Sequence, residues 1–495
     1  MDARFRAESI PSLNAMVASH ARVRPSADAI VTPERVISFG EFQAGIIASA
    51  DQLSVHGVTK RSRVGVALGE TFAHLVLLFA IGRLGAVAVP LDKRWTVSEK
   101  QKVASAFHTD IVLIDDDEED LSPLSIVQVS EDWVHRQSLI TGNRQEQSSP
   151  HDPFIFSLSS GTTGSPAGPA LSQAQLFHRF VNQWVTLRLN GGDRFLSATP
   201  LYFGATRSFC LSTLCAGGTV VLSTPGMIAE DLVRLFVDSK ATATFLVPTL
   251  LRRLLALDDV SLAPLQQLRV LISSGAVLHD DERDEVRRRI CPNLFNYYGT
   301  TEGGGISILT PEDAVTGAGS VGRAAFMVNI ETVDRNGVPV ANGEVGRLRY
   351  RGPGVADGPL YGADDIAEAN EDGWFYPGDL ASIRDDGFVF LRGRDKEMIL
   401  RGGVNIYPVE IEAEISRLDS VVDVAVAGYP SREFGEEIAA FVVAQPALTE
   451  ATIMAHCRSK LAPYKIPSRI IFCGSFPRSE SGKIRKDDLV KMHIS

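Results

Sequence analysis

Short apolar segments alternate with helical patterns over most of the N-terminal half of the chain, and this alternation constrains the fold more than any other feature. The apolar segments are rich in β-branched residues, and we expect buried strands at 63–68, 85–92, 110–115, 218–223, 241–247 and 269–276. Apolar residues recur at helical spacing in the segments between them, and we expect helices at 72–84, 229–239 and 248–257. Buried strands that alternate with helices indicate an α/β architecture with largely parallel sheets.

The pattern changes after residue 317. Residues 317–391 contain short strands punctuated by glycine, which predicts a small, antiparallel, barrel-like part. A compact α/β pattern then resumes, with a helix expected at 409–418 and strands at 421–430 and 437–445. We place a boundary at Arg394–Glu397, so that residues 1–394 form a large N-terminal region and residues 395–495 a small α+β C-terminal domain.

Charge, hydropathy and cysteine usage exclude several classes of partner. The net charge is −11 and no basic tract occurs, which argues against nucleic acid. The most apolar helical run, 74–90, is interrupted by Arg83 and Gly85, so we expect no membrane span. The five cysteines (Cys210, Cys215, Cys291, Cys457 and Cys473) have neither metal-ligand nor disulfide spacing. These features predict a cytoplasmic protein, and we allow for a homodimer.

The segment Ser157–Gln173, SLSSGTTGSPAGPALSQ, gathers hydroxyl groups and glycines as a phosphate-binding loop does. It does not match the ATP loop G-x-x-x-x-G-K-[ST], and no G-x-G-x-x-G dinucleotide fingerprint follows a strand. By itself the segment fits a flexible linker about equally well. Four further clusters favour the phosphate loop, and they lie at 296–304 (NYYGTTEGG), 373–380 (GWFYPGDL), 393–415 (GRDKEMILRGGVNIYPVEIEAEI) and 476–489 (FPRSESGKIRKDDL).

The five motifs, in this order along essentially the whole chain, resemble the adenylate-forming superfamily of acyl- and aryl-CoA synthetases, peptide-synthetase adenylation domains and beetle luciferases. The resemblance implies two α/β subdomains plus a small β-barrel, followed by a mobile C-terminal domain. It also implies chemistry in two halves. A carboxylate attacks the α-phosphate of Mg-ATP to give an acyl-adenylate and pyrophosphate, and a thiol then displaces AMP.

The resemblance assigns roles to residues of this chain by their place in the motifs. Nucleotide binding is expected of Ser160, Gly161, Thr162, Thr163, Gly164, Gly275, Ala276, Tyr298, Gly299, Thr300, Asp379 and Arg394. Among them, Thr162 and Thr163 would contact the leaving phosphates, Tyr298 would stack on adenine, and Asp379 with Arg394 would hold the ribose. The catalytic residues would be Thr301 at the α-phosphate, Glu302 as the Mg²⁺ ligand, and Lys483 bridging carboxylate and α-phosphate.

The same resemblance implies a moving part and an acid pocket. Lys396 is expected to be the hinge residue, and Gly403 to lie where the thiol of coenzyme A enters. The acyl pocket is expected from Tyr202, Phe203, Gly204, Arg207, Gly303 and Gly304. Arg207 could face a second polar group on the acid, but we favour an arginine that faces solvent or is anchored to its own helix. No acidic residue occurs in 199–209, which disfavours an amino-acid substrate.

Three positions depart from the usual family pattern. Ala167 stands where a loop lysine is common, Gln173 where a histidine is common, and Pro377 where a threonine is common. Arg179, on the following helix, could fill the space of the missing lysine. The sequence therefore predicts an ATP-dependent acid–CoA ligase. Two alternatives stay open, namely an enzyme that loads a carrier-protein thiol and a nucleotide-binding protein with impaired turnover.

Overall fold

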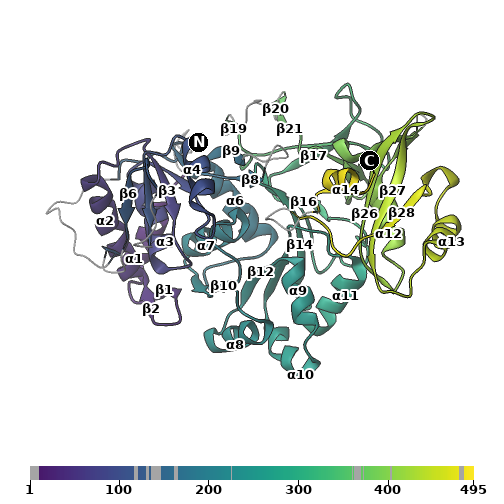
Figure 1. Ribbon diagram of the computed structural model, residues 1–495. Coiled ribbons are helices and arrows are strands. Elements are labelled where there is room, and N and C mark those ends of the chain that lie inside the picture. The colour runs from purple at the N-terminus through teal and green to yellow at the C-terminus, as the bar shows by residue number, and fades with distance from the viewer. Residues whose placement is uncertain are drawn as a thin grey trace, which may run out of the picture. The chain divides into compact units, whose positions relative to one another are not determined.

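The computed structural model describes residues 10–115, 121–129, 133–134, 146–160, 166–224, 226–358, 360–361, 370–371, 373–401, 404–478 and 484–494. The chain divides into two compact units. The larger unit comprises Met1–Asn329 and Arg351–Phe375, and the smaller comprises Ile330–Tyr350 and Tyr376–Ser495. Figure 1 labels the elements of both units.

The first sheet of the larger unit has the strand order β19-β9-β7-β4-β3-β5-β6, with β8 paired to β9. Its strands are β3 (Arg63–Ala67), β4 (Val87–Pro90), β5 (Ile111–Ile114), β6 (Ile126–Gln128), β7 (Pro153–Phe156), β8 (Ser159–Ser160), β9 (Pro166–Ser172) and β19 (Leu360–Tyr361). The pairings from β6 to β7 are parallel, whereas β8 and β19 both run antiparallel to β9.

The second sheet of the larger unit has the order β16-β15-β14-β13-β12-β10-β11-β1-β2. Its strands are β1 (Asp28–Val31), β2 (Val36–Ser38), β10 (Arg194–Ser197), β11 (Thr219–Leu222), β12 (Ala243–Leu246), β13 (Val270–Ser273), β14 (Leu294–Thr300), β15 (Gly304–Leu309) and β16 (Arg323–Ala324). The central pairings, from β1 to β14, are parallel, and the strands beyond them on both sides are antiparallel.

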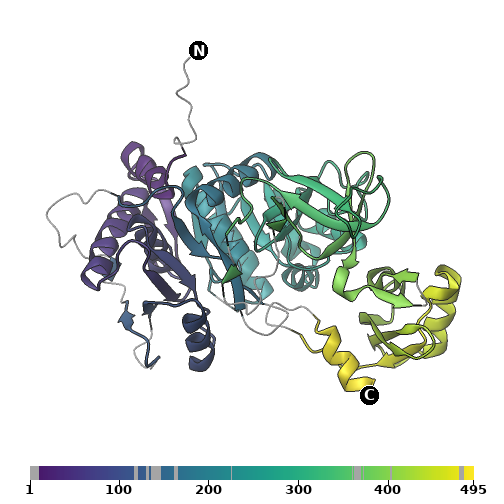
Figure 2. The same cartoon turned by 90° about the horizontal axis from the view of Figure 1, so that it is seen from above.

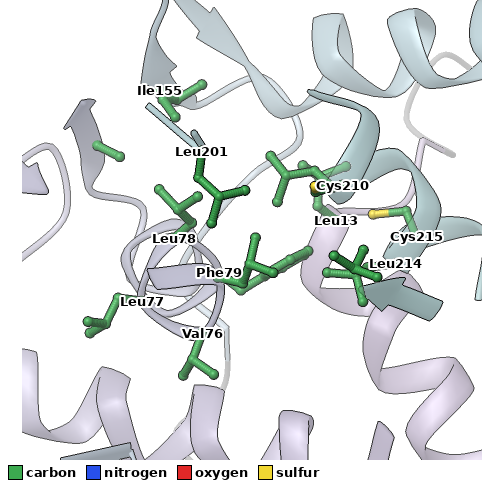
Figure 3. Packing of buried hydrophobic residues seen from close by; sticks show 14 of the residues in the cluster. Leu13, Val76, Leu77, Leu78, Phe79, Ile155, Leu201, Cys210, Leu214 and Cys215 are labelled. Atoms are coloured by element: carbon green, nitrogen blue, oxygen red, sulfur yellow. The ribbon is translucent and has the colours of Figure 1, made fainter. Parts of the chain in front are cut away.

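The helices of the larger unit are α1 (Leu13–Val23), α2 (Phe39–Val55), α3 (Phe72–Arg83), α4 (Val97–Ala106), α6 (Gln173–Thr186), α7 (Gly204–Ala216), α8 (Ala229–Ser239), α9 (Pro248–Leu255), α10 (Asp259–Leu262), η2 (Ala263–Gln267) and α11 (Asp280–Arg289). The helix α3 is apolar on every side, which is the pattern of a helix buried all round. Its side chains meet those of α1 and α7 in the main core, where Phe79, Leu13 and Leu214 lie together (Figure 3). Helices α8, α9 and α11 line a second core against the other sheet (Figure 1).

The smaller unit contains an antiparallel sheet and a C-terminal α+β part. The antiparallel sheet has the strand order β20 (Asn370–Glu371), β21 (Trp374–Phe375), β18 (Gly346–Arg351), β22 (Asp379–Ile383) and β23 (Val389–Arg394), with β17 (Asn329–Val333) paired to β18. After η3 (Asp395–Glu397) come β24 (Ile399–Arg401), β25 (Val404–Ile406), α12 (Pro408–Ile415), β26 (Val421–Ser431), β27 (Gly435–Ala444), α13 (Glu450–Lys460), η4 (Pro463–Lys465), β28 (Arg469–Phe472) and α14 (Lys486–His493). Helices α12 and α13 pack on one face of the C-terminal sheet and α14 on the other. Figure 2 shows this part in yellow-green and yellow.

The α/β architecture predicted from the sequence is confirmed, because each of the expected strands and helices of the larger unit is present. The expected barrel is not confirmed. Closure requires a pairing between the end strands of a sheet, and among the described residues none joins β20 to β23. Among the helices that the structure describes, none combines the length and the hydropathy that a membrane span requires. The predicted boundary at Arg394–Glu397 coincides with η3, and the division there stays a prediction.

Candidate functional site

Five predicted nucleotide residues lie on two neighbouring strands or directly after them: Gly275 and Ala276 follow β13, and Tyr298, Gly299 and Thr300 end β14. Strands β13 and β14 are parallel, with Ser273 opposite Asn296, so the segments after them emerge at the same edge of the sheet. Gly275 adopts φ +95° and is exposed, as is Ala276. The hydroxyl of Ser273 is buried at this edge and, among the described residues, has no hydrogen-bond partner. Ligands of α/β sheets bind at the carboxyl ends of parallel strands, which makes this edge the candidate site.

Adjacent tyrosines on β14 face opposite ways. Tyr297 is buried, and its ring lies 5.7 Å from that of Phe209 on α7. Burial raises the pKa of Tyr297 to about 12. Tyr298 is only half-buried. Because successive side chains of a strand alternate between its faces, Tyr298 is the one of the two tyrosines that is available to a ligand.

A sharp hairpin presents the predicted catalytic residues Thr301 and Glu302. It joins β14 to β15, with Thr300 opposite Gly304. The amide of Gly303 donates to the hydroxyl of Thr300 at 2.9 Å. Gly304 adopts φ +67°, a left-handed conformation that favours glycine. Thr301 and Glu302 are half-buried at its tip, so their side chains are not enclosed.

The side chain of Arg179, on α6, binds the backbone of this hairpin. Its Nε donates to the carbonyl of Gly354 at 2.8 Å, and one Nη donates to the carbonyl of Thr301 at 3.2 Å. The other Nη donates to the carbonyl of Glu302. Sequence reasoning considered Arg179 only as a substitute for the missing lysine. Its place between Leu176 and Phe180, both buried on the same helix face, was the signal for a buried, paired arginine.

The arms of the predicted phosphate loop are β8 and β9, which pair through Ser159 with Ala167 and Ser160 with Pro166. Gly161, Thr162, Thr163 and Gly164 lie outside the described residues. The strand β9 passes directly into α6, whose N-cap is Ser172. Gln173, one of the departures from the family pattern, is buried, and its amide oxygen accepts from the backbone of Leu13 at 2.9 Å. This glutamine therefore fixes the start of α1.

The loop before α7 carries the predicted acyl-pocket residues. Arg207 is buried and donates from one Nη to the carbonyls of Leu201 (3.1 Å) and Tyr202 (2.7 Å). It is thus anchored to its own loop. The ring of Tyr202 lies edge-on to Trp95 at 5.0 Å and to Phe203 at 5.4 Å. The role of these residues in acid binding stays a prediction.

Sequence reasoning missed Glu70, which precedes α3. Its carboxylate accepts from the amide of Leu201 at 2.7 Å, and Arg207 donates to the carbonyl of the same residue. Glu70 and Arg207 together therefore bind both backbone groups of Leu201. Burial raises the pKa of Glu70 to about 7, and the bond from Leu201 partly opposes this rise. Burial also lowers the pKa of Arg207 to about 10. No local sequence signal marks Glu70, because its partner is 131 residues away.

The predicted ribose residues belong to the smaller unit and lie beside each other. Asp379 on β22 is opposite Arg394 on β23, and the Nε of Arg394 is 3.1 Å from the Asp379 carboxylate. Arg394 also donates to the carbonyl of Pro377 at 2.5 Å. Gly378, directly before Asp379, adopts φ +77°, a conformation that favours glycine. The antiparallel pairing of β22 and β23 brings the aspartate and the arginine to the same end of the two strands.

The predicted hinge residue Lys396 lies in η3, between β23 and β24. Lys483 and Gly403 lie outside the described residues. The neighbour of Lys396, Glu397, forms an ion pair of 2.8 Å with Lys486 at the start of α14. The hinge segment is therefore connected to the helix that follows the Lys483 loop.

A hollow of about 480 Å³ in the larger unit is lined by polar side chains, among them His151, Gln175, His178 and Asp357. It contains none of the predicted nucleotide or acid residues. Gln175 donates to the carboxylate of Asp357 at 2.8 Å, so two of the lining residues already satisfy each other. Burial lowers the pKa of His178.

Comparison with known proteins identifies the family of this chain. Residues 17–359 match the AMP-binding enzyme family, and residues 410–483 match the AMP-binding enzyme C-terminal domain. The indoleacetate–CoA ligase of Aromatoleum aromaticum is 31% identical over 96% of this chain and 97% of that protein. A feruloyl-CoA synthase of an Amycolatopsis species is 30% identical over 95% of this chain and 96% of that protein. The structure of ATP-bound MatB from Rhodopseudomonas palustris has a TM-score of 0.88 at 26% identity and covers 98% of this chain and 99% of that one.

The chain therefore belongs to the AMP-binding enzyme family, the adenylate-forming superfamily that its five motifs predicted. Its similarity to the two ligases extends over nearly the full length of both chains.

Proposed function

We propose that this protein is an ATP-dependent, AMP-forming acid–CoA ligase. It joins a carboxylic acid to ATP, releasing pyrophosphate, and then transfers the acyl group from AMP to the thiol of coenzyme A. The observation that carries the proposal is the near-complete coverage of both chains in the match to the indoleacetate–CoA ligase. A match of that extent includes the nucleotide-binding region as well as the C-terminal part that the second half-reaction requires.

In the first half-reaction, two anions must approach each other while charge accumulates on the α-phosphate. Thr301 donates to that phosphate, and Lys483 neutralises charge between it and the carboxylate. Tyr298 stacks on adenine, and Asp379 with Arg394 holds the ribose. Support for these roles comes from the position of each residue in its motif.

The Glu302 carboxylate fits a magnesium ion, because Mg²⁺ is commonly bound by one or two carboxylates together with substrate phosphates. Its half-buried place at the hairpin tip leaves the carboxylate accessible to such an ion. Bound there, Mg²⁺ would neutralise charge on the phosphates. The buried, unpartnered hydroxyl of Ser273, among the described residues, would add a polar group at the same strand edge.

In the second half-reaction, the C-terminal domain turns about Lys396, withdraws Lys483, and presents Gly403 at the entry of the CoA thiol. The place of Lys396 in the short turn η3, between two strands, supports a hinge. A glycine at position 403 leaves room for a pantetheine arm.

The acid is an aryl or arylalkyl monocarboxylic acid. Two observations support this class. The predicted acid loop contains two aromatic rings, Tyr202 and Phe203, which contact each other, and Tyr202 also contacts Trp95. The two similar ligases are named for indoleacetate and for ferulate, both aromatic acids.

A screen of acids tests the proposal. The purified protein is given Mg-ATP with indole-3-acetate, ferulate, benzoate or palmitate, and pyrophosphate release is measured with and without CoA. We expect an aromatic acid to be fastest and CoA to yield the acyl-CoA, seen by mass spectrometry. A phosphopantetheinyl carrier that replaces CoA with higher kcat/KM would instead favour the carrier-loading alternative. ATP binding without release for any acid would favour the impaired nucleotide-binding alternative, which Ala167 motivates.

A further inference from the structure

Helix α6 connects two parts of the nucleotide site that are far apart in sequence. At its N-terminus it continues β9, the second arm of the phosphate loop. One face of the helix packs against β15, which follows the hairpin bearing Glu302. A rigid helix between the two parts can fix the distance between the leaving phosphates and the metal ligand.

Arg179 makes the principal connection. Its three hydrogen bonds go to the carbonyls of Thr301, Glu302 and Gly354, so it joins the hairpin to a second segment. Asn182, one helical turn further on, donates to the carbonyl of Gly305 at 3.3 Å. Both side chains are buried, at 8% and 6% exposure, and such groups cannot exchange these bonds for water.

The fit around Arg179 is close. A Cβ on Gly304 would lie 2.9 Å from its Cδ, and a Cβ on Gly354 would lie 3.0 Å from its Cγ. Both glycines therefore leave space that the arginine fills. The guanidinium is planar and offers donors in a fixed fork, so it can reach three carbonyls at once, whereas a lysine ammonium on the same backbone cannot copy that geometry.

The hydrogen bonds of Arg179 show what its guanidinium does in this fold. Nε and both Nη atoms each donate to a backbone carbonyl, either of the hairpin or of the segment at Gly354. The guanidinium therefore holds the backbone of the hairpin.

We infer that Arg179 is a positioning residue for adenylation, which holds the Thr301–Glu302 turn at a fixed place relative to α6 and β9. The inference rests on the proposed function, because Glu302 is the magnesium ligand there. Side chains that must meet a metal and a phosphate together tolerate little displacement.

Two variants, Arg179→Met and Arg179→Lys, test the inference, with Arg234→Met as the matched control. Arg234 lies on α8 with its side chain 70% exposed. Pyrophosphate release is measured against Mg²⁺ concentration at fixed ATP and acid. We expect Arg179→Met to lower kcat by about 100-fold, as misplacement of a reacting group does. We expect the midpoint of its Mg²⁺ titration to rise about tenfold and Arg179→Lys to lie between. The control should match the unmodified protein.

A role in stability alone makes a different prediction. Partial unfolding lowers the maximal rate of pyrophosphate release but leaves the Mg²⁺ midpoint of the remaining folded protein unchanged. The midpoint is also read without turnover, from the Mg²⁺ dependence of the thermal shift that ATP produces. An unchanged midpoint in both Arg179 variants by both readouts overturns the inference.

Glu302→Gln separates this failure from a failure of the proposed function. If Glu302→Gln also leaves the Mg²⁺ midpoint unchanged in an active enzyme, the assignment of Glu302 as metal ligand is wrong. If it raises the midpoint while both Arg179 variants do not, the positioning role of Arg179 alone is rejected.

Discussion

Lys486 and Glu397 form an ion pair of 2.8 Å between residues 89 positions apart in the sequence. Lys486 lies at the first position of α14, and Glu397 at the end of the turn that contains the predicted hinge. The same ammonium is 2.8 Å from Glu412 on α12. Burial disfavours the charged form, but the two carboxylates outweigh it and raise the pKa of Lys486. This lysine ties α14 to both the hinge segment and the C-terminal core.

Removing Lys486 should destabilise the protein. In Lys486→Met two carboxylates lose their partner, and breaking a buried ion pair costs about 3–5 kcal/mol when both groups are enclosed. Because the Glu397 side chain is 40% exposed, we expect the free energy of unfolding to fall by about 2 kcal/mol. Urea unfolding measures this loss. Lys491→Met, an exposed position of α14, is the control. Equal stability of the two variants would show that the ion pair contributes nothing.

Glu70 should make stability depend on pH. Its pKa, about 7, lies above the ordinary value of 4.5, so the folded state binds the proton more tightly than the unfolded state. The contribution of Glu70 to stability is therefore largest at low pH and is lost as pH rises from about 4.5 to 7. Asp92, Arg94 and Arg207 are the charged groups that act on it.

We therefore expect Glu70→Gln to gain stability relative to the unmodified protein as pH rises through this window, by up to roughly 3 kcal/mol. The amide oxygen of glutamine can still accept from Leu201. Urea unfolding at pH 5 and pH 8 measures the difference. A stability difference between the two proteins that is the same at both pH values would contradict the raised pKa.

Restoring a lysine at position 167 should improve the use of ATP. Ala167 is half-buried on β9, opposite Ser159 and directly after the phosphate loop. A charge-assisted bond to phosphate contributes about 1.5–3 kcal/mol, so Ala167→Lys should raise kcat/KM for ATP about tenfold and leave the KM of the acid unchanged. Ala167→Met is the control for side-chain length. Identical ATP kinetics in all three proteins would show that the loop does not contact the phosphates.

Lys483→Ala should separate the two half-reactions. The lysine is required only where charge develops during adenylation, so pyrophosphate release should fall by several orders of magnitude. Thioester formation from preformed acyl-adenylate and CoA should keep its rate. Single-turnover experiments measure each step. Parallel loss of both steps would rule out the assigned role.

The local elements of the fold were predictable because their signals are local. Short apolar runs rich in β-branched residues predicted β3, β5 and β13, and helical spacing predicted α3. The alternation along β14 likewise makes Tyr298 available while Tyr297 enters the core. Whether strands close into a barrel depends on pairing between distant segments, and that expectation is not confirmed.

The α/β class, the family and the residues that carry the predicted chemistry follow from the sequence, because motifs and periodicity are properties of neighbouring residues. The side chains that hold those residues in place are seen only in the folded chain. Arg179 reaches carbonyls 122 and 123 residues away, and Glu70 reaches Leu201 over 131. Such partners are chosen by the packing of distant segments, where a buried charge must find the donors or acceptors that the fold brings to it.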